Sequence, residues 1–415
     1  MKQSKLILLG LLLPLALQAQ ESPYYFDGSI SREVLERYLD RSVTAGYFLL
    51  KGPVERYEFP YREDDIRMVK NIGAKFIGRS IYCWGGESAL ADTSFTGYAK
   101  RTAERLHAYD PEIIFQGCLF EFVSPDVNNL PIPAWVFKAF GKKVEKRNFN
   151  SLEMIKRKDP SAPVRWGGRG GGVPQICNLE TQMWFYFLAR TYIDLGCEAL
   201  HLGQVELIGA DDPEKEAYAS CLKKIRDYAK KHARRHYVLL DGHTPKWGFI
   251  KDGVSLLDFN SFPLRIKEVE DNPMDGVLEV GHRDGIYCRS KAALSPSGWY
   301  AEHFPYLVEF DNFGSNGKQG IANLQDDFCW GYDDITWLAV HEEDYRNNFL
   351  WYAFDWLHKT DPNGHLQFCL IRMITCKGSE RTLRSYFANT NSENCPVGYS
   401  QEETIKKIWN TRLAY

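Results

Sequence analysis

Several features that define common classes of protein are missing from this chain of 415 residues. Basic residues are not in excess, because 51 lysines and arginines stand against 54 acidic residues. A surface for nucleic acid or anionic lipid needs such an excess. After the first twenty residues, no apolar run approaches the roughly 18 residues that a membrane helix requires. The sequence therefore predicts a folded protein with neither a nucleic-acid partner nor a membrane-inserted segment.

The ten cysteines form no recognisable metal or redox motif. No CxxC pair occurs, so the spacing supports neither a zinc ribbon nor a thioredoxin-like site. Four of the cysteines lie in or beside apolar runs, where a free thiol behaves as a small hydrophobic residue: Cys83, Cys118, Cys197 and Cys369. Cys376 and Cys395 lie in a loop-rich region and are the best candidates for a disulfide.

The first twenty residues have the pattern of a secretory signal peptide. Lys2 and Lys5 precede an apolar run from Leu6 to Leu17 that is too short to span a bilayer, and Ala19 offers a small residue for cleavage. No cysteine follows directly, which argues against a lipid anchor. We expect residues 1–20 to be removed and the mature protein to be secreted or periplasmic.

Short apolar runs alternate with amphipathic helical patterns along the rest of the chain, as is typical of βα units. Eight strands are expected, at 46–51, 75–82, 112–122, 198–208, 237–241, 255–262, 306–311 and 366–371. Right-handed connections between eight such units predict a single (β/α)8 TIM barrel over residues 21–415, with an open doubly wound sheet as the alternative. A further strand candidate at 277–280 leaves the strand numbers after the fifth open.

A long insertion, residues 123–179, separates the third strand from its helix. Ordinary connections of this kind have about two to six residues, so the insertion is expected to be a lid or binding loop. At the carboxyl face of a barrel it would form one wall of a cleft, with Trp135 or Trp166 reaching the substrate.

Polar residues near the carboxyl ends of the strands are candidates for a functional site, because barrels place their active sites there. The candidates are Arg79, Trp84, Gln116, Glu121, His201, Gln204, Glu206, Asp241, His243, Asp258, Asn260, Glu309, Asp311 and Asn312. A carboxylate inside an apolar strand must be paired, protonated or facing a cleft, because an isolated buried charge is costly. Glu206 and Glu309 both fit that description.

The chain is rich in aromatic residues, with 24 phenylalanines, 23 tyrosines and 11 tryptophans. Many of them fall in loops. Aromatic ring faces stack on the C–H faces of sugars, while polar side chains bind the sugar hydroxyls, so this mixture is typical of a carbohydrate cleft. Trp299 is expected at the cleft together with Trp84.

Two segments, HLGQVELIG with Glu206 and PYLVEFDNFG with Glu309, make the chain resemble the large clan of barrel glycoside hydrolases. More broadly, it resembles exported barrel proteins of bacterial polysaccharide-degrading systems. The resemblance is architectural and covers Gly46 to Trp409. Where the clan has an asparagine before its acid/base, this chain has Val205.

The resemblance implies a glycoside hydrolase that cleaves a poly- or oligosaccharide with two carboxylates. It implies Glu206 as acid/base and Glu309 as nucleophile, with retention of configuration and without a metal or other cofactor. A separation of about 5–5.5 Å between the two carboxyl groups gives retention, and about 6.5–9.5 Å gives inversion. Asp241 and Asp311 are the substitutes if the strand numbering shifts.

Two other classes of function remain open. A metal-dependent barrel hydrolase would use nitrogen and oxygen ligands from the set His201, Asp241, His243, Asp258 and His282. The first predicted strand lacks the HxH pair that such hydrolases carry. The other class is a barrel that binds glycan without cleaving it, which the missing asparagine before Glu206 keeps open.

Overall fold

The computed structural model describes residues 22–51, 60–158, 165–374 and 385–412. The predicted signal peptide and Cys376 of the candidate disulfide lie outside these ranges. The nine cysteines within them are free thiols. No helix in the described ranges is long and apolar enough to cross a membrane.

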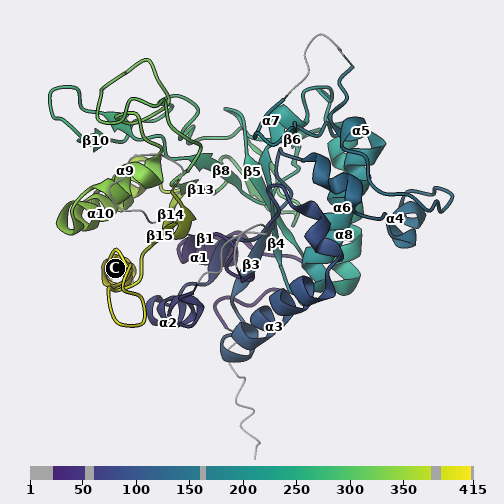
Figure 1. Ribbon diagram of the computed structural model, residues 1–415, viewed down its shortest axis with the longest axis horizontal. Coiled ribbons are helices and arrows are strands. Elements are labelled where there is room, and N and C mark those ends of the chain that lie inside the picture. Colours follow the sequence, from purple (N-terminus) through teal and green to yellow (C-terminus); the bar gives the residue numbers. More distant parts are fainter. Residues whose placement is uncertain (1–21, 52–59, 159–164, 375–384, 413–415) are drawn as a thin grey trace, which may run out of the picture.

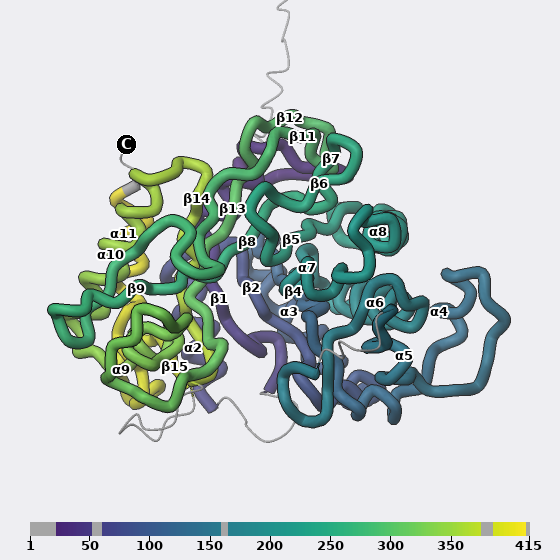
Figure 2. The backbone as a smooth tube through the Cα atoms, turned by 90° about the horizontal axis from the view of Figure 1, so that it is seen from above, coloured from purple at the N-terminus to yellow at the C-terminus, as the bar shows by residue number. Residues whose placement is uncertain are grey.

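Eight parallel strands close into a barrel, which confirms the predicted (β/α)8 fold; Figure 2 shows the ring from above. In order around the barrel they are β1 (Ser42–Ala45), β2 (Phe76–Ile81), β3 (Ile114–Cys118), β4 (Ala199–Gln204), β5 (Leu239–His243), β8 (Asn260–Pro263), β13 (Tyr306–Glu309) and β14 (Gly364–Met373). Pairing of β1 with β14, with Val43 opposite Phe368, closes the ring. The short β15 (Ser385–Phe387) adds antiparallel to β14.

Helices surround the barrel and follow most of its strands (Figure 1). They are α2 (Arg62–Ile72) after β1, α3 (Thr93–Tyr109) after β2, α6 (Leu179–Asp194) after β3, α8 (Glu216–His232) after β4, α9 (Asp334–Val340) and α10 (Glu343–Thr360) after β13, and α11 (Glu402–Arg412) at the end. After β5 and β8 the chain forms short strands instead: β6 (Ile250–Lys251), β7 (Val254–Ser255), β9 (Lys267–Glu268), β10 (Gly276–Val277), β11 (Ala293–Leu294) and β12 (Tyr300–Ala301). The strand candidate at 277–280 belongs to this loop region, so it does not alter the barrel numbering.

The predicted first strand was wrong. Residues 46–51 form turns, and β1 lies just before them. Tyr47 has a positive φ of 59°, which breaks extended structure. Phe48, Leu49 and Leu50 are fully buried all the same. The apolar run at 46–51 therefore indicated buried residues and not a strand.

The inserted segment between β3 and α6 contains η2 (Pro125–Asn129), α4 (Ala134–Ala139) and α5 (Ser151–Ile155), and α4 and α5 pack beside α6 (Figure 1). Another short element, η1 (Glu87–Ala91), follows β2. The buried Glu87 carboxylate accepts hydrogen bonds from the backbone and hydroxyl of Ser124. This contact fixes the start of the insertion against the β2 side of the barrel.

The amino-terminal end of the barrel is covered by residues that precede β1. Phe26, Ile30 and Leu35, the last from α1 (Arg32–Leu39), form one buried cluster with the first residues of several strands, including Phe76 and Ile114. This packing seals the end of the barrel opposite to the carboxyl ends of the strands.

Candidate active site

A cleft of about 1710 Å³ opens at the carboxyl ends of the strands. Eight of the residues predicted from the sequence line it: Arg79, Trp84, Glu121, His201, Gln204, His243, Asp311 and Asn312. Ligand sites are typically concave and combine apolar walls with a few convergent polar groups. This cleft has both.

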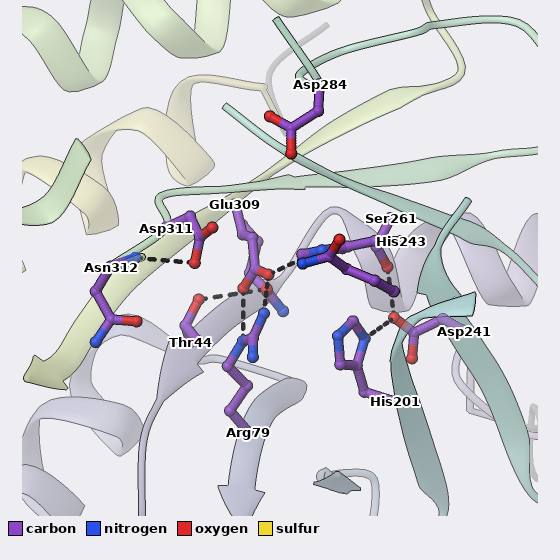
Figure 3. A network of polar contacts seen from close by, with 12 residues as sticks. Thr44, Arg79, His201, Asp241, His243, Ser261, Asp284, Glu309, Asp311 and Asn312 are labelled. Atoms are coloured by element: carbon purple, nitrogen blue, oxygen red, sulfur yellow. Dashed lines mark hydrogen bonds and ion pairs between the residues drawn. The ribbon is translucent and has the colours of Figure 1, made fainter. Parts of the chain in front are cut away.

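Glu309, the last residue of β13, is 3% exposed and lies between Arg79 and His243 (Figure 3). Arg79 donates from Nε to Oε2 at 2.8 Å and from Nη2 to Oε1. His243 donates from Nε2 to Oε1 at 2.9 Å, and Arg372 Nη1 lies 3.5 Å from Oε2. Both carboxylate oxygens are therefore fixed in position.

The electrostatic environment keeps Glu309 ionised. Burial alone would raise its pKa, but the Arg79 guanidinium and the hydrogen bond from His243 outweigh burial and hold the pKa well below its usual range. Glu309 is thus a preformed carboxylate at neutral pH.

Arg79 reaches Glu309 from an irregular position in β2. Its φ is +55°, and the register of β2 against β3 shifts between Ile77 and Ile81. Left-handed backbone at a residue other than glycine costs on the order of 1–3 kcal/mol and is concentrated at functional sites. The Arg79 backbone N–H donates to Gln116 Oε1 at 3.0 Å. From this irregular position the guanidinium reaches Glu309 on β13, three strands away around the ring.

A second histidine–carboxylate pair lies beside the first (Figure 3). His201 Nδ1 donates to Asp241 Oδ2 at 2.8 Å. Asp241 also accepts from Gln116 Nε2 at 2.6 Å and from the Ser261 hydroxyl. With the proton of His201 on Nδ1, its Nε2 is a hydrogen-bond acceptor, and this buried atom has no partner within the described part of the chain.

His201, His243 and Glu309 offer ligand atoms within 4.8 Å of one another, a spacing that a metal ion could use. The surrounding charge disfavours a divalent cation there, because the Arg79 guanidinium already contacts Glu309 and the Arg372 guanidinium lies beside it. Asp258, expected as a further ligand, is instead bound by Arg226 Nη2 at 3.0 Å.

A network of ion pairs orders the loops after β8 and β13. Arg265 Nη1 donates to Asp311 Oδ2 at 2.9 Å, and the same guanidinium also binds Asp284. Burial raises the pKa of Asp311, but Arg265 more than offsets this and the net pKa is lowered. Asp334 of α9 accepts from the backbone of Ile266 at 3.0 Å and of Asp311 at 3.2 Å. These contacts hold the two strand ends together.

Aromatic rings form one wall of the cleft. Trp84 stacks on Phe122 at 4.7 Å between ring centroids and meets Phe120 at 5.4 Å and Trp166 at 5.6 Å edge-on. Trp166 of the insertion lines the cleft, whereas Trp135 stacks on Phe187 of α6 at 5.7 Å.

Seven of the expected site residues are not among those that line the cleft: Gln116, Glu206, Asp241, Asp258, Asn260, Trp299 and Glu309. Glu309 is buried beneath the cleft, and Asp258 is bound by Arg226. Gln116 and Asp241 lie buried beneath the cleft in the network described above, and Asn260 is the buried first residue of β8. The Trp299 indole donates to Ile30 O at 3.0 Å, so Trp299 lies at the sealed amino-terminal end and is not part of this cleft.

Glu206, expected as acid/base, lies on the short helix α7 (Val205–Ile208) directly after β4, with an exposed side chain. It is not among the residues that line the cleft. The sequence predicted strand as far as 208. β4 instead ends at Gln204; just before that end Gly203 adopts a φ of +67°, and the register against β5 shifts between His201 and Gln204.

Arg265 and Arg372 are cleft residues that the sequence analysis missed. Arg372 is 4% exposed in the apolar strand β14, and its Nη2 donates to Asn312 Oδ1. A charged side chain inside an apolar strand must be paired or face a cleft. Applied to arginines as well as carboxylates, this rule would have selected Arg372.

Fold and site together define a class of protein: a (β/α)8 barrel with a buried, arginine-bound carboxylate at the carboxyl end of its seventh strand. Neither a protein-family model nor a curated protein sequence matches the chain. Several solved structures do resemble it. The debranching enzyme of Nostoc punctiforme in its native form is 12% identical with a TM-score of 0.42, over 91% of this chain and 81% of that one.

A β-glucuronidase from Ruminococcus gnavus is 9% identical with a TM-score of 0.35, over 85% of this chain and 46% of that one. An α-galactosidase from Thermus thermophilus is 17% identical with a TM-score of 0.29, over 53% of this chain and 39% of that one. The chain thus spans less than half of each of these two proteins. At such identities and TM-scores, the similarity decides nothing about the site.

Proposed function

We propose that the protein is a glycoside hydrolase that cleaves a poly- or oligosaccharide with two carboxylates and retention of configuration. The observation that carries the proposal is Glu309, a buried carboxylate kept ionised by Arg79 and His243 beneath an aromatic-walled cleft. A retaining glycosidase needs such an anion to attack the anomeric carbon.

The surroundings of Glu309 suit a nucleophile. Its pKa lies below its usual range, so no separate base is needed to ionise it. The positive charge that develops on the sugar in an oxocarbenium-like transition state is stabilised by the nearby anion. Arg79 and His243 fix the orientation of the carboxylate, so little reorganisation is required during attack.

The cleft also offers the contacts that a sugar needs. Trp84 and Trp166 line the cleft, and aromatic rings suit the apolar faces of sugar rings. His201 Nε2 is a buried acceptor without a partner in the described ranges, so a sugar hydroxyl that donates to it would satisfy it.

Turnover of a panel of 4-nitrophenyl α- and β-glycosides, including glucosides, galactosides and glucuronides, tests the proposal. The Glu309→Gln variant is expected to lose turnover of every member that the wild type cleaves. Incubation with the matching 2-deoxy-2-fluoro glycoside should label the peptide that contains Glu309, as seen by mass spectrometry. Wild-type rates in Glu309→Gln would refute the assignment of the nucleophile.

A metal-dependent hydrolase is the second candidate, and the spacing of His201, His243 and Glu309 is the observation in its favour. Elemental analysis of the purified protein, followed by dialysis against a chelator, separates the two candidates. A stoichiometric metal together with activity that is lost on chelation and restored by the metal would favour the second.

A further inference from the structure

Glu121 is a buried carboxyl residue in the wall of the cleft. It follows β3 by three residues, is 5% exposed, and lines the cleft that also contains Arg79 and His243. The sequence analysis selected it as one of the polar residues near the strand ends and gave it no catalytic role. Its position on the cleft contrasts with that of Glu206, whose side chain is exposed on α7 and outside the lining.

The end of β4 is shaped around the Glu121 side chain. The backbone N–H of Gln204 donates to Glu121 Oε2 at 3.0 Å. A Cβ at Gly203 would lie 1.7 Å from that same oxygen, so only glycine leaves room for the carboxyl group. Gln204 pairs with His243 across β4 and β5, and His243 donates to Glu309 at 2.9 Å. The hydrogen bond from Gln204 therefore holds Glu121 at the end of β4, beside His243, which in turn binds Glu309.

Glu121 differs in charge environment from the other carboxyl groups of the cleft lining, which are Asp126, Asp284, Asp311 and Asp327. Arg265 binds two of them, Asp284 and Asp311, and Arg283 Nε lies 3.5 Å from Asp327. Burial raises the pKa of Asp126, but hydrogen bonds from Ser88 outweigh burial and lower it.

Glu121 has neither a cationic partner nor a hydrogen bond to Oε1 within the described part of the chain. A carboxyl group that must deliver a proton needs to hold that proton at the working pH, and a neighbouring cation would remove it. Of the carboxyl groups that line the cleft in the described ranges, only Glu121 and Asp126 have no cationic partner, and both oxygens of Asp126 accept hydrogen bonds, from Ser88 and from Asn129.

We infer that Glu121 is the proton donor of the proposed hydrolysis; this assignment rests on the proposed function and deepens it. Glu121 transfers its proton to the glycosidic oxygen while the bond from that oxygen to the anomeric carbon breaks, and the oxygen keeps the electron pair and leaves as an alcohol. Glu309 forms the new bond to the anomeric carbon. The Glu121 carboxylate then takes a proton from water, the water oxygen bonds to the anomeric carbon, and Glu309 leaves as a carboxylate.

The Glu121→Gln variant tests this assignment, because the amide oxygen can still accept from Gln204 but the side chain cannot donate an acidic proton. 2,4-Dinitrophenyl glycosides need no protonation of their leaving group, whereas methyl glycosides and natural oligosaccharides do. We expect Glu121→Gln to keep kcat/KM for the activated substrate within about tenfold of wild type and to lose about 10²- to 10⁴-fold in kcat/KM on the unactivated one. Its kcat on the activated substrate should fall, because Glu121 no longer takes the proton of the attacking water. The exposed Glu104→Gln on α3 is the matched control.

Rescue by azide distinguishes a catalytic role of Glu121 from a structural one. In Glu121→Ala, azide can enter the vacated space and attack the glycosyl-enzyme, so turnover of the dinitrophenyl substrate should rise with azide and yield a glycosyl azide. The alkaline limb of the pH profile should also disappear in Glu121→Gln.

The possible results test the assignment of Glu121 and the proposed function separately. Wild-type rates of Glu121→Gln on both substrates, or the activated-substrate signature in Glu206→Gln instead, would overturn the assignment of Glu121 and leave the proposed function intact. Absence of wild-type turnover on the whole panel, or full activity of Glu309→Gln, would overturn the proposed two-carboxylate function and the inference with it.

Discussion

Replacing Arg79 with methionine removes one partner of a buried ion pair of the site. Methionine has a similar length and no charge. The side chains of Arg79 and Glu309 are 8% and 4% exposed, so Glu309 would remain in the interior with His243 as its closest hydrogen-bond donor. The expected consequence is a loss of stability that depends on pH.

The magnitude follows from the burial of the pair. Breaking a buried pair by removing one partner costs about 3–5 kcal/mol when the remaining charge is uncompensated. This is the upper limit here, because Arg372 Nη1 stays 3.5 Å from Glu309 Oε2. That loss changes the folding equilibrium by roughly two to four powers of ten. Relief of the strained Arg79 backbone does not offset it, since methionine adopts a φ of +55° no more readily.

The sign of the pH dependence can be worked out from the pKa of Glu309. In the wild type this pKa is lowered, so the stability that Glu309 contributes is present above the ordinary value of about 4.3 and is lost as the pH falls through the lowered one. Without Arg79 the lowering effect of its guanidinium is lost, so the pKa of Glu309 in the variant lies above that in the wild type and less of this stability is present at neutral pH. The difference between wild type and Arg79→Met should be largest near pH 7 and smaller near pH 4.

Urea unfolding at both pH values measures this difference, and a double variant supplies the control. Glu309→Gln carries no charge, so adding it to Arg79→Met should recover part of the loss at pH 7. An identical loss at pH 4 and pH 7, with no recovery in the double variant, would show that the ion pair is not what stabilises this part of the barrel.

Two further substitutions address the walls of the cleft. Gly203→Ala should lower the free energy of unfolding by more than Gly253→Ala does. Both glycines have positive φ, but only at Gly203 would the added Cβ collide with a neighbour, Glu121. Equal losses in urea unfolding would contradict the close fit of Gly203 to Glu121. Trp166→Ala should raise KM for an oligosaccharide about three- to tenfold with little change in kcat, because about 0.5–1.5 kcal/mol of ring contact is lost. Trp135→Ala on α4 is the control and should leave KM unchanged.

The barrel itself could be predicted from the sequence because eight apolar runs with helical patterns between them leave few topologies. Glu309 could be selected because a carboxylate in an apolar strand needs a partner or a cleft. The identity of that partner could not be read from the sequence. Arg79 lies 230 residues away, and it comes into reach only when the ring of strands is closed.

Backbone irregularities explain most of the remaining differences. Strand residues alternate between the inside and the outside of a barrel, and a bulge reverses that alternation. Arg79 and Gly203 both have positive φ, and the register shifts beside each of them. The sequence carried no local signal for the shift at Arg79. The one at Gly203 moved Glu206 from the predicted strand onto α7 and let Glu121 occupy the strand end.

Closure of the ring by β1 and β14 also affects how the molecule folds. Val43 pairs with Phe368, so the first and last strands of the barrel meet only after more than three hundred intervening residues are in place. Until then both strands have unpaired edges, which are open to association with other chains. Contacts of such long range make folding slow. A fragment that ends before β13 would lack Glu309 as well as the closing strand.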